Sequence, residues 1–550
     1  MTTTDYSDKS VLIVDDQKPF LIMLKGIISS LGAKQIQSAG SAEAALSACR
    51  KEKFDFIIAD LHLGANKKNG SQLLEEIRVS KKAKPDTVFI MVSGDSHRPI
   101  VLGSIERSPD DYIIKPFSQA QLSNRLSKAH KKKQILKPIY VEIFKEDYQE
   151  AINVCLDLIT QGCKYRQTCA HLLTELYWKQ EQFDAAKHML AAILKNKPVA
   201  WAQVAMAKTE FFMGNYEESI ELAKKVLAAR LHLLEGHDIL ANCYLAQERI
   251  EDALREIRFS LDLSPFSMER QYMGATIGRV SRDFEFARQC CKELFEQSKR
   301  SVYKDLSHMC NFVRSILDAA QYAEDKGKRN KYQQEALLTL QRLRNDELVI
   351  RKSDEFDYSI YENIVSARVN MLDGKALDAK RLLAESQMEI EQKFPSFPMV
   401  YAPDSIKVMT DLGEFADAQK LASKMKESDY PVDDNIQFVL DNLDEVANNQ
   451  LNEFTRYNEQ GIQHFNEGKY QAAMDDFSNA LKYSPVNADV AINLLQCLRR
   501  LMSQTQKPEL VMMVECKKTF RLVEGIPLSE KQTAEFIEIK EDLSKYMDLK

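Results

Sequence analysis

The sequence predicts a multidomain protein, in which an α/β domain with a doubly wound, five-stranded parallel sheet precedes an all-α solenoid of helical hairpins. The chain has 550 residues, which is enough for three or four domains of about 150 residues each. It contains 18 Gly and 15 Pro, whereas average usage would give roughly 66 of the two together. Most of the chain therefore lacks the turn residues that sheets require.

Short β-branched runs alternate with helical stretches in residues 1–130, and this alternation indicates a parallel sheet covered on both faces. The expected strands are Val11–Val14, Gln35–Ala39, Phe54–Ala59, Thr87–Val92 and Tyr112–Ile114. The expected helices are Pro19–Leu31, Ala42–Arg50, Ser71–Val79, a stretch near Arg98–Arg107 and one that opens near Ser118. In such a sheet, functional groups collect where the strands end.

Polar residues end four of these strands. They are Asp15 and Asp16 after the first strand, Asp60 after the third, Ser93 after the fourth and Lys115 after the fifth. Three adjacent carboxylates repel one another unless a cation neutralises them, and an oxygen-only cluster suits Mg2+. A lysine and a hydroxyl beside the metal would stabilise a transferred phosphoryl group. Asp60 is then the expected nucleophile, because a carboxylate can form an aspartyl phosphate.

Four segments resemble the receiver domain of bacterial response regulators, which has a flavodoxin-like fold. They are Val11–Asp16, Phe56–Asp60, Met91–Gly94 and Asp111–Phe117, and the resemblance covers about residues 9–130. It implies that Asp60 accepts the phosphoryl group and that Asp15, Asp16, Asp60 and the backbone carbonyl of His62 bind Mg2+. It also implies that Lys115 pairs with the phosphoryl group, that Ser93 and Tyr112 act as the switch, and that the Lys115–Pro116 bond is cis.

Two features depart from the family pattern. The loop from Asp60 to Gly70 is about two residues longer than usual, and Leu63-Gly64 replaces the common Met-Pro. The resemblance places His62 and Asp95 at positions that tune access of water to the phosphoryl group, but for His62 a solvated loop residue is the favoured interpretation. A degenerate receiver that has lost phosphorylation is the alternative, but all five polar positions are intact, so we expect phosphorylation.

Downstream, an aromatic or apolar residue is followed three positions later by a small one, and the pair recurs every 33 to 35 residues. The pairs are Tyr148/Ala151, Phe183/Ala186, Tyr216/Ser219, Ile250/Ala253 and Phe284/Ala287. The small residue allows two helices to pack closely. This pattern resembles the tetratricopeptide repeat (TPR) family, and the clearest copy is Tyr457–Pro485, where Gln460 and His464 replace the usual Leu and Tyr. Unrelated helical hairpins are the alternative.

The phase loosens between residues 301 and 450, where Ala336, Ala379 and Ala418 suggest degenerate repeats and a break near residues 395–404 is conceivable. Ser529, with Gln532 three residues later, starts an expected capping helix, Ser529–Met547. The expected domains are a receiver at 1–130, a helical linker at 131–147, TPR repeats at 148–300, degenerate repeats at 301–450, a TPR repeat at 451–503 and capping helices at 504–550.

The first helices of successive repeats should line a groove for a partner helix or extended peptide. The expected groove residues are Trp178, Trp201, Lys208, Phe211 and Asn242, beside His171, Glu175 and Asp238. Aromatic side chains ringed by polar ones resemble interface hot spots. Alternatively, Trp201 and Phe211 fill the gap between neighbouring repeats.

Composition excludes several classes of function. No apolar run is long enough for a membrane span or a signal peptide, so we expect a cytoplasmic protein. The net charge of -6 gives no general attraction to DNA. The ten cysteines and nine histidines form no zinc pattern, and the thiols are expected to be reduced.

The sequence thus suggests a response regulator that is phosphorylated by a histidine kinase or a phosphotransfer protein and controls protein–protein interaction through its TPR array. It is not expected to be an enzyme beyond catalysing its own phosphorylation and dephosphorylation. A phosphate sink in a phosphorelay and a constitutive scaffold with a structural receiver are the alternatives, and a homodimer is left open.

Overall fold

The structure is a computed structural model that divides into two compact units, residues 1–308 and residues 309–550. It describes residues 6–64, 67–94, 108–196, 198–229, 233–344, 356–430, 434–504, 510–526 and 528–546. Unit 1 contains the sheet and the first helical pairs, and the described residues of unit 2 form helices.

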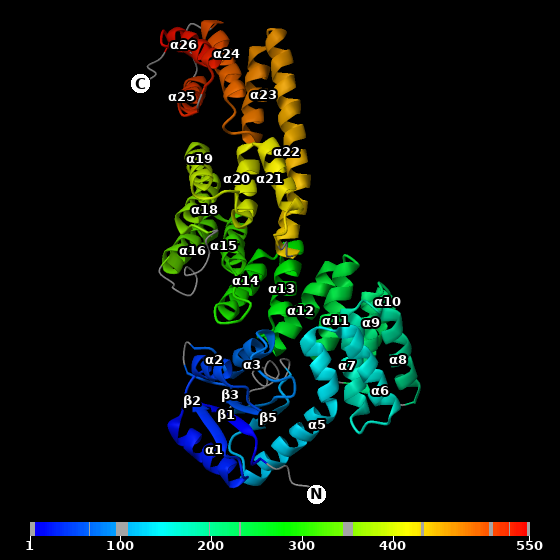
Figure 1. Ribbon diagram of the computed structural model, residues 1–550. Coiled ribbons are helices and arrows are strands. Elements are labelled where there is room, and N and C mark those ends of the chain that lie inside the picture. Colours follow the sequence, from blue (N-terminus) through cyan, green and yellow to red (C-terminus); the bar gives the residue numbers. More distant parts are fainter. Residues whose placement is uncertain are drawn as a thin grey trace. The chain divides into compact units, whose positions relative to one another are not determined.

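The sheet of unit 1 has five parallel strands in the order β2-β1-β3-β4-β5 (Figure 1). The strands are β1 (Ser10–Val14), β2 (Gln35–Ala39), β3 (Phe56–Asp60), β4 (Val88–Ser93) and β5 (Asp111–Ile114). Every residue of β1, β3 and β4 is buried, as expected for strands covered on both faces. The register aligns Ala59 with Met91, and Ser93 with Ile114, so the strand ends meet at one edge.

Helices cover both faces of this sheet. One core cluster joins the sheet to α2 (Ala42–Lys51) and α3 (Gly70–Val79), and another joins it to α1 (Lys18–Ser30) and the first turns of α5 (Gln119–Lys145). These findings confirm the doubly wound fold. The helix expected near Arg98–Arg107 lies outside the described residues. The predicted boundary at residue 130 falls inside α5, which continues without a break to Lys145 and includes Pro138.

Antiparallel helical pairs follow α5 in unit 1. They are built from α6 (Tyr148–Thr160), α7 (Arg166–Lys179), α8 (Phe183–Asn196), α9 (Ala200–Phe212), α10 (Tyr216–Ala228), α11 (Leu233–Ala246), α12 (Ile250–Leu263), α13 (Met268–Val280) and α14 (Phe284–Ser298). All five recurring small residues are at most 1% exposed. A Cβ on Gly278 would lie 2.9 Å from the backbone nitrogen of Ala287, so close packing of the pair explains the small residues on both helices.

Unit 2 continues with helices. They are α15 (Leu306–Gln321), which begins just before the unit boundary, α16 (Lys326–Arg344), α18 (Tyr358–Leu372), α19 (Ala376–Lys393), the 3-10 turn η1 (Met399–Tyr401), α20 (Ala402–Leu412), α21 (Phe415–Glu427), α22 (Asp434–Asn466), α23 (Tyr470–Tyr483), α24 (Ala488–Gln504), α25 (Leu510–Glu524) and α26 (Glu530–Leu543). Ala336, Ala379 and Ala418 are buried here, as the sequence pattern suggests.

Two details of unit 2 differ from the sequence-based outline. A single core cluster contains Leu383 of α19 and Ile406 of α20, so no break separates the residues on either side of 395–404. The predicted boundary at 450/451 falls inside α22. At the C-terminus, Ser529 caps α26 and Gln532 bonds back to it, which confirms the capping box.

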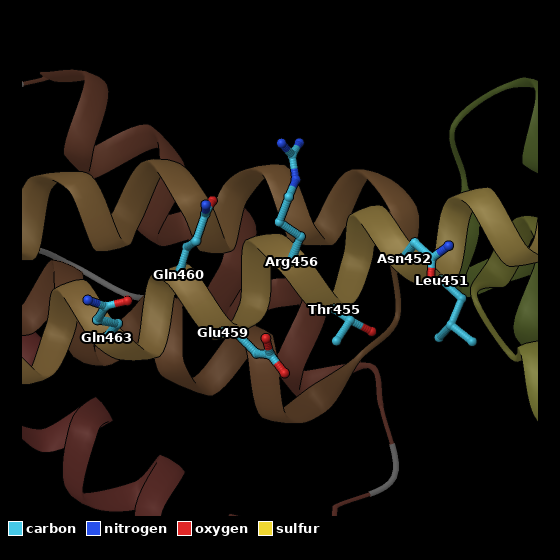
Figure 2. A pocket seen from close by; sticks show the side chains of 7 residues that line it. All are labelled: Leu451, Asn452, Thr455, Arg456, Glu459, Gln460 and Gln463. Carbon is cyan, nitrogen blue, oxygen red and sulfur yellow. The ribbon is translucent and has the colours of Figure 1, made fainter.

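One face of α22 is open to solvent. Seven residues of this helix line a shallow groove with a volume of about 520 Å³ (Figure 2). They are Leu451, Asn452, Thr455, Arg456, Glu459, Gln460 and Gln463. A groove lined by a single helix encloses no small molecule, in contrast to the concave pockets of ligand sites. Among the described residues, no helix is both long enough and apolar enough to cross a membrane.

Candidate functional site

Three carboxylates meet at the carboxyl edge of the sheet. Asp15 and Asp16 follow β1, Asp60 ends β3, and one oxygen of each lies within 4.8 Å of the others. Asp15 and Asp60 are buried, whereas Asp16 is exposed. The cluster predicted from sequence therefore forms. Its oxygen-only composition fits a hard divalent cation such as Mg2+, with the exposed Asp16 beside solvent that would complete the coordination shell.

Local backbone contacts fix Asp60 at the end of its strand. The Leu61 amide donates to the Val92 carbonyl at 2.8 Å, and the Gly70 amide donates to the Leu61 carbonyl at 2.9 Å. A Cβ on Gly70 would overlap the Asp60 carbonyl oxygen and lie 2.9 Å from Met91 Sδ. Glycine is therefore needed where α3 begins, because the longer loop returns directly under the acceptor strand.

Lys115 reaches both buried carboxylates. Its Nζ donates to Asp60 Oδ2 at 2.7 Å and to Asp15 Oδ2 at 2.9 Å. The Lys115–Pro116 bond is cis, as expected, and the Lys115 amide donates to the Ser93 carbonyl at 2.7 Å. The backbone of β5 is thus joined to the end of β4 at the residue that carries the ammonium group.

The protonation of Asp60 reflects opposing effects. Burial raises the pKa of Asp60 above its usual value, and Asp15 acts in the same direction because its carboxylate can accept a hydrogen bond from the protonated form of Asp60. Lys115 and the His62 amide, which donates to Asp60 Oδ1 at 3.1 Å, lower this pKa but do not offset the burial. A second cation beside the cluster would favour the ionised, nucleophilic form.

The two expected switch residues lie on β4 and β5, the strands that lead to this edge of the sheet. Ser93 ends β4 and is fully buried, and Tyr112 in β5 aligns with Met91 of β4. The Tyr112 ring packs, partly buried, against the core cluster under α2 and α3. The site thus combines a carboxylate nucleophile, a lysine and a hydroxyl at adjoining strand ends, and this set can accept and stabilise a phosphoryl group.

The long loop after Asp60 is tied to α3. Lys68 and Lys82 both pair with Glu76, and the Lys82 bond is 3.0 Å long. Burial raises the pKa of Glu76, but the two lysines more than offset this effect, so the pKa lies below its usual value. The described end of this loop is therefore held to α3 by a charge contact.

Comparison with known proteins agrees with this geometry. Residues 11–127 match the response regulator receiver domain family. The chemotaxis protein CheY-3 of Vibrio cholerae is 30% identical over 118 residues, which are 22% of this chain and 88% of that protein. The regulatory protein PhoP of alkaline phosphatase synthesis in Bacillus subtilis is 29% identical over 177 residues, which are 32% of this chain and 67% of PhoP.

A solved structure is also similar. The receiver domain of NtrX from Brucella abortus has 27% sequence identity, covers 22% of this chain and 98% of its own length, and gives a TM-score of 0.21. The chain belongs to the response regulator family through its N-terminal receiver domain. These matches cover at most 32% of the chain, so what the whole protein acts on and binds is a matter for proposal.

The predicted groove residues are only partly brought together. Trp178 of α7 and Thr209 of α9 are joined by a 3.0 Å bond from the indole nitrogen, and exposed Lys208 lies over the Trp178 ring at 5.0 Å. Trp201 meets His171 edge-on at 5.2 Å and packs partly buried against the core between α8 and α9. Four of the five predicted residues thus lie on neighbouring helices α7 and α9, and Asn242 lies on α11.

The other groove residues have structural partners. Phe211 packs on Phe212 and on Tyr216 of the following helix. The Asn242 side chain donates to the Asp238 carbonyl in its own helix at 2.9 Å. The Asp238 carboxylate receives two bonds, of 2.8 and 2.9 Å, from the buried Arg270 of the next pair. Phe211, Asn242 and Asp238 thus make contacts within their own helical pair or with the next one.

Sequence reasoning missed two residues that touch the site or its connection to the helices. The Phe20 ring lies under Lys115 Nζ at 3.6 Å. Lys133 of α5 pairs with Asp110, directly before β5, at 3.2 Å. The only sequence signal for the position of Phe20 is that it follows Pro19 in the first helical turn after Asp16. Lys133 belongs to the basic run at residues 130–133, and such runs usually form a solvated surface.

Proposed function

We propose that this chain is a response regulator that accepts a phosphoryl group on Asp60 from a histidine kinase or a phosphotransfer protein. The observation that carries the proposal is the position of Lys115 Nζ, 2.7 Å from Asp60 Oδ2, in a cluster whose three carboxylates lie within 4.8 Å. Asp15, Asp16, Asp60 and the His62 carbonyl would hold Mg2+. When bound, the metal supplies charge neutralisation at the phosphoryl oxygens.

Each of the other residues at the site has its own proposed role. Asp60 supplies the nucleophilic oxygen, Lys115 pairs with the phosphoryl oxygens, and Ser93 donates its hydroxyl to them. Tyr112 would follow the movement of Ser93, because it lies in β5, the strand that pairs with β4 and with Ser93 at its end. Apart from forming and hydrolysing its own aspartyl phosphate, the chain is proposed to catalyse no reaction.

Helix α5 is the proposed route from the receiver to the helical pairs. It is a single helix of 27 residues, and beyond the sheet it contacts the receiver again. Lys133 pairs with Asp110, Lys137 pairs with Asp86 at 3.0 Å, and Glu146 at its end pairs with Lys81 at 2.6 Å. A change in β5 would therefore reach α5 through its side chains as well as through the chain.

A second contact within unit 1 supports this coupling. Ser301, after α14, donates a 3.2 Å hydrogen bond to Glu75 of α3 in the receiver. The helical pairs are thus connected to the receiver at both ends of their run. A receiver movement at either contact would change how the pairs are presented to a partner.

The proposed output is protein binding by a TPR-type array. The buried small residues at a period near 34 support a repeat, and stacked repeats present long open surfaces that suit a helix or an extended peptide. Trp178, Trp201 and Lys208 are the best-placed contact residues, since they lie together on α7 and α9.

The proposal is tested by hydrogen exchange and partner capture on the full chain. Mg2+ with beryllofluoride, a phosphoryl mimic, should change exchange in α5 beyond residue 130 and around Ser301 and should alter the set of captured proteins. The Asp60→Asn chain treated in the same way is the control. Changes confined to the sheet, with equal capture in both states, would contradict control of the array and favour a phosphate sink or a scaffold.

A further inference from the structure

We infer that Phe20 is a positioning residue for Lys115. The face of the Phe20 ring holds the Lys115 ammonium group beside Asp60. The Phe20 ring centroid lies 3.6 Å from Lys115 Nζ. The same Nζ donates to Asp15 and Asp60, so two carboxylates and one aromatic face surround it. The inference rests on the proposed function, because the partnership of Lys115 with a phosphoryl group belongs to that proposal.

The turn that holds Asp15 also places Phe20. The Gln17 amide donates to Asp15 Oδ1 at 2.8 Å, and the Phe20 amide donates to the Gln17 carbonyl at 3.1 Å. Pro19 occupies the first turn of α1, where its fixed φ suits helix initiation. A movement of this turn would therefore displace a metal-binding carboxylate and the ring together.

The hydrophobic core anchors the other side of the ring. Phe20 packs against the core cluster beneath α1 and α5, and its ring meets Phe117 in an edge-to-face contact at 6.0 Å. Phe117 follows the cis Lys115–Pro116 bond by one residue. The ring thus bridges the helix after the first acidic pair and the segment that carries the lysine.

This arrangement restricts the position of the Lys115 ammonium group. The lysine side chain is long and flexible, and its ammonium group is a point charge without the fixed geometry of arginine. If Asp15 bound a cation instead, Lys115 would lose one of the two carboxylates to which it donates. An aromatic face attracts the ammonium group through its quadrupole and offers no competing proton acceptor, so it holds Nζ beside Asp60 while leaving its N–H groups for phosphoryl oxygens.

A series of fluorinated phenylalanines at position 20 separates this role from simple packing. One, two and three ring fluorines weaken the negative face stepwise while changing ring volume little. In the full chain with Mg2+, beryllofluoride affinity should fall at each step. Phe20→Leu, which removes the face, should weaken it by roughly two- to thirtyfold, the range expected for the loss of a cation–π contact.

A metal-free measurement tests the geometry without phosphoryl chemistry. Protons on the Lys115 side chain next to Nζ should show an upfield ring-current shift in the parent chain, and Phe20→Leu should abolish it. The same fluorinated residues at Phe56 are the matched control, because that ring packs in the same core but faces Tyr6 at 5.5 Å and His130 at 5.1 Å. Fluorinated phenylalanines at position 56 should leave the affinity for beryllofluoride unchanged.

Three results are decisive. An affinity that is flat across the fluorinated series at position 20, or a Lys115 proton shift that is the same in Phe20→Leu, would overturn the positioning role. An equal loss at Phe20 and Phe56 would assign the effect to core packing and would overturn it as well. If the parent chain binds no beryllofluoride at all, the proposed function itself fails, and the proton shift still decides whether the ring holds the lysine.

Discussion

Lys133 Nζ lies 3.2 Å from Asp110 Oδ1 and joins the helix that leaves the receiver to the residue that leads into β5. Lys133 is 8% exposed, and its ammonium group lies over the Tyr140 ring at 4.0 Å. Burial lowers the pKa of Lys133, and Asp110 offsets part of this effect. The pair is therefore a buried charge contact at the point where the sheet meets the continuous helix.

Lys133→Met should loosen this junction. The change keeps the aliphatic stem but removes the cation from the Asp110 carboxylate, which still accepts a hydrogen bond from the Phe89 amide, so we expect a loss of about 1–3 kcal/mol in the stability of the receiver. Hydrogen exchange of α5 amides between residues 126 and 145 should accelerate. Lys128→Met, on an exposed position of the same helix, is the control. Equal exchange in both variants would refute the role of the pair.

His130 should make the receiver sensitive to acid. Its ring packs on Phe56 at 5.1 Å, and burial, followed by the nearby Lys9, lowers the pKa of His130 below its usual 6.5. The unfolded chain thus binds a proton more readily than the folded chain, and the free energy of unfolding should decrease as the pH falls below about 6.5. His130→Phe keeps an aromatic ring and should remove this part of the pH dependence. Parallel pH profiles for parent and variant would contradict the account.

Gly70→Ala should damage the acceptor site. The added methyl group would overlap the Asp60 carbonyl, which belongs to the backbone and cannot move without β3. We expect a loss of stability above about 2 kcal/mol and a weaker response to beryllofluoride. Gly26→Ala is the matched control, since a Cβ there meets no heavy atom within 4 Å and the helix should gain about 0.5–1 kcal/mol. A neutral Gly70→Ala in urea unfolding would refute the close approach.

Asp404→Asn should destabilise unit 2. The fully buried Asp404 accepts from Arg314 at 2.9 Å and from Arg368 at 2.7 Å. Burial raises the pKa of Asp404, but the two arginines outweigh it and hold the pKa below its usual value. Removing the charge leaves buried guanidinium groups undercompensated, at an expected cost of about 3–5 kcal/mol. Asp378→Asn removes an exposed partner of Arg381 and should cost less than about 0.5 kcal/mol in the same thermal unfolding measurement.

The sequence predicted the structure best where a local pattern can place its residues in only one way. Strand ends in a parallel sheet share one edge, so the meeting of Asp15, Asp16 and Asp60 could be predicted from their positions after buried runs. The recurring small residues could likewise be predicted to be buried, and Ala186 and Ala253 are fully so. Both predictions depend only on periodicity along the chain.

Contacts between residues far apart in sequence could not be predicted in this way. The bond between Arg314 and Asp404 spans 90 residues, and the ring contact of Phe20 with Lys115 depends on how α1 and β5 approach each other. The groove shows the same limit, because Asp238 was expected to face a partner but is bound by Arg270. The spacing of residues along a helix predicts which face of the helix a side chain lies on. Which neighbour it meets there depends on how the helical pairs stack into a superhelix.

The phosphoacceptor role of Asp60 is the central claim, and intact-mass spectrometry of the full chain tests it most directly. With Mg2+ and a small acyl phosphate donor, the parent should gain one phosphoryl group on Asp60, the proposed nucleophile, which ends β3 within the acidic cluster and accepts from Lys115. Asp60→Asn should gain none, and omission of Mg2+ should suppress the gain in the parent. A phosphoryl group carried equally by the Asp60→Asn chain, or a parent that stays unmodified with every donor and kinase tried, would contradict the account.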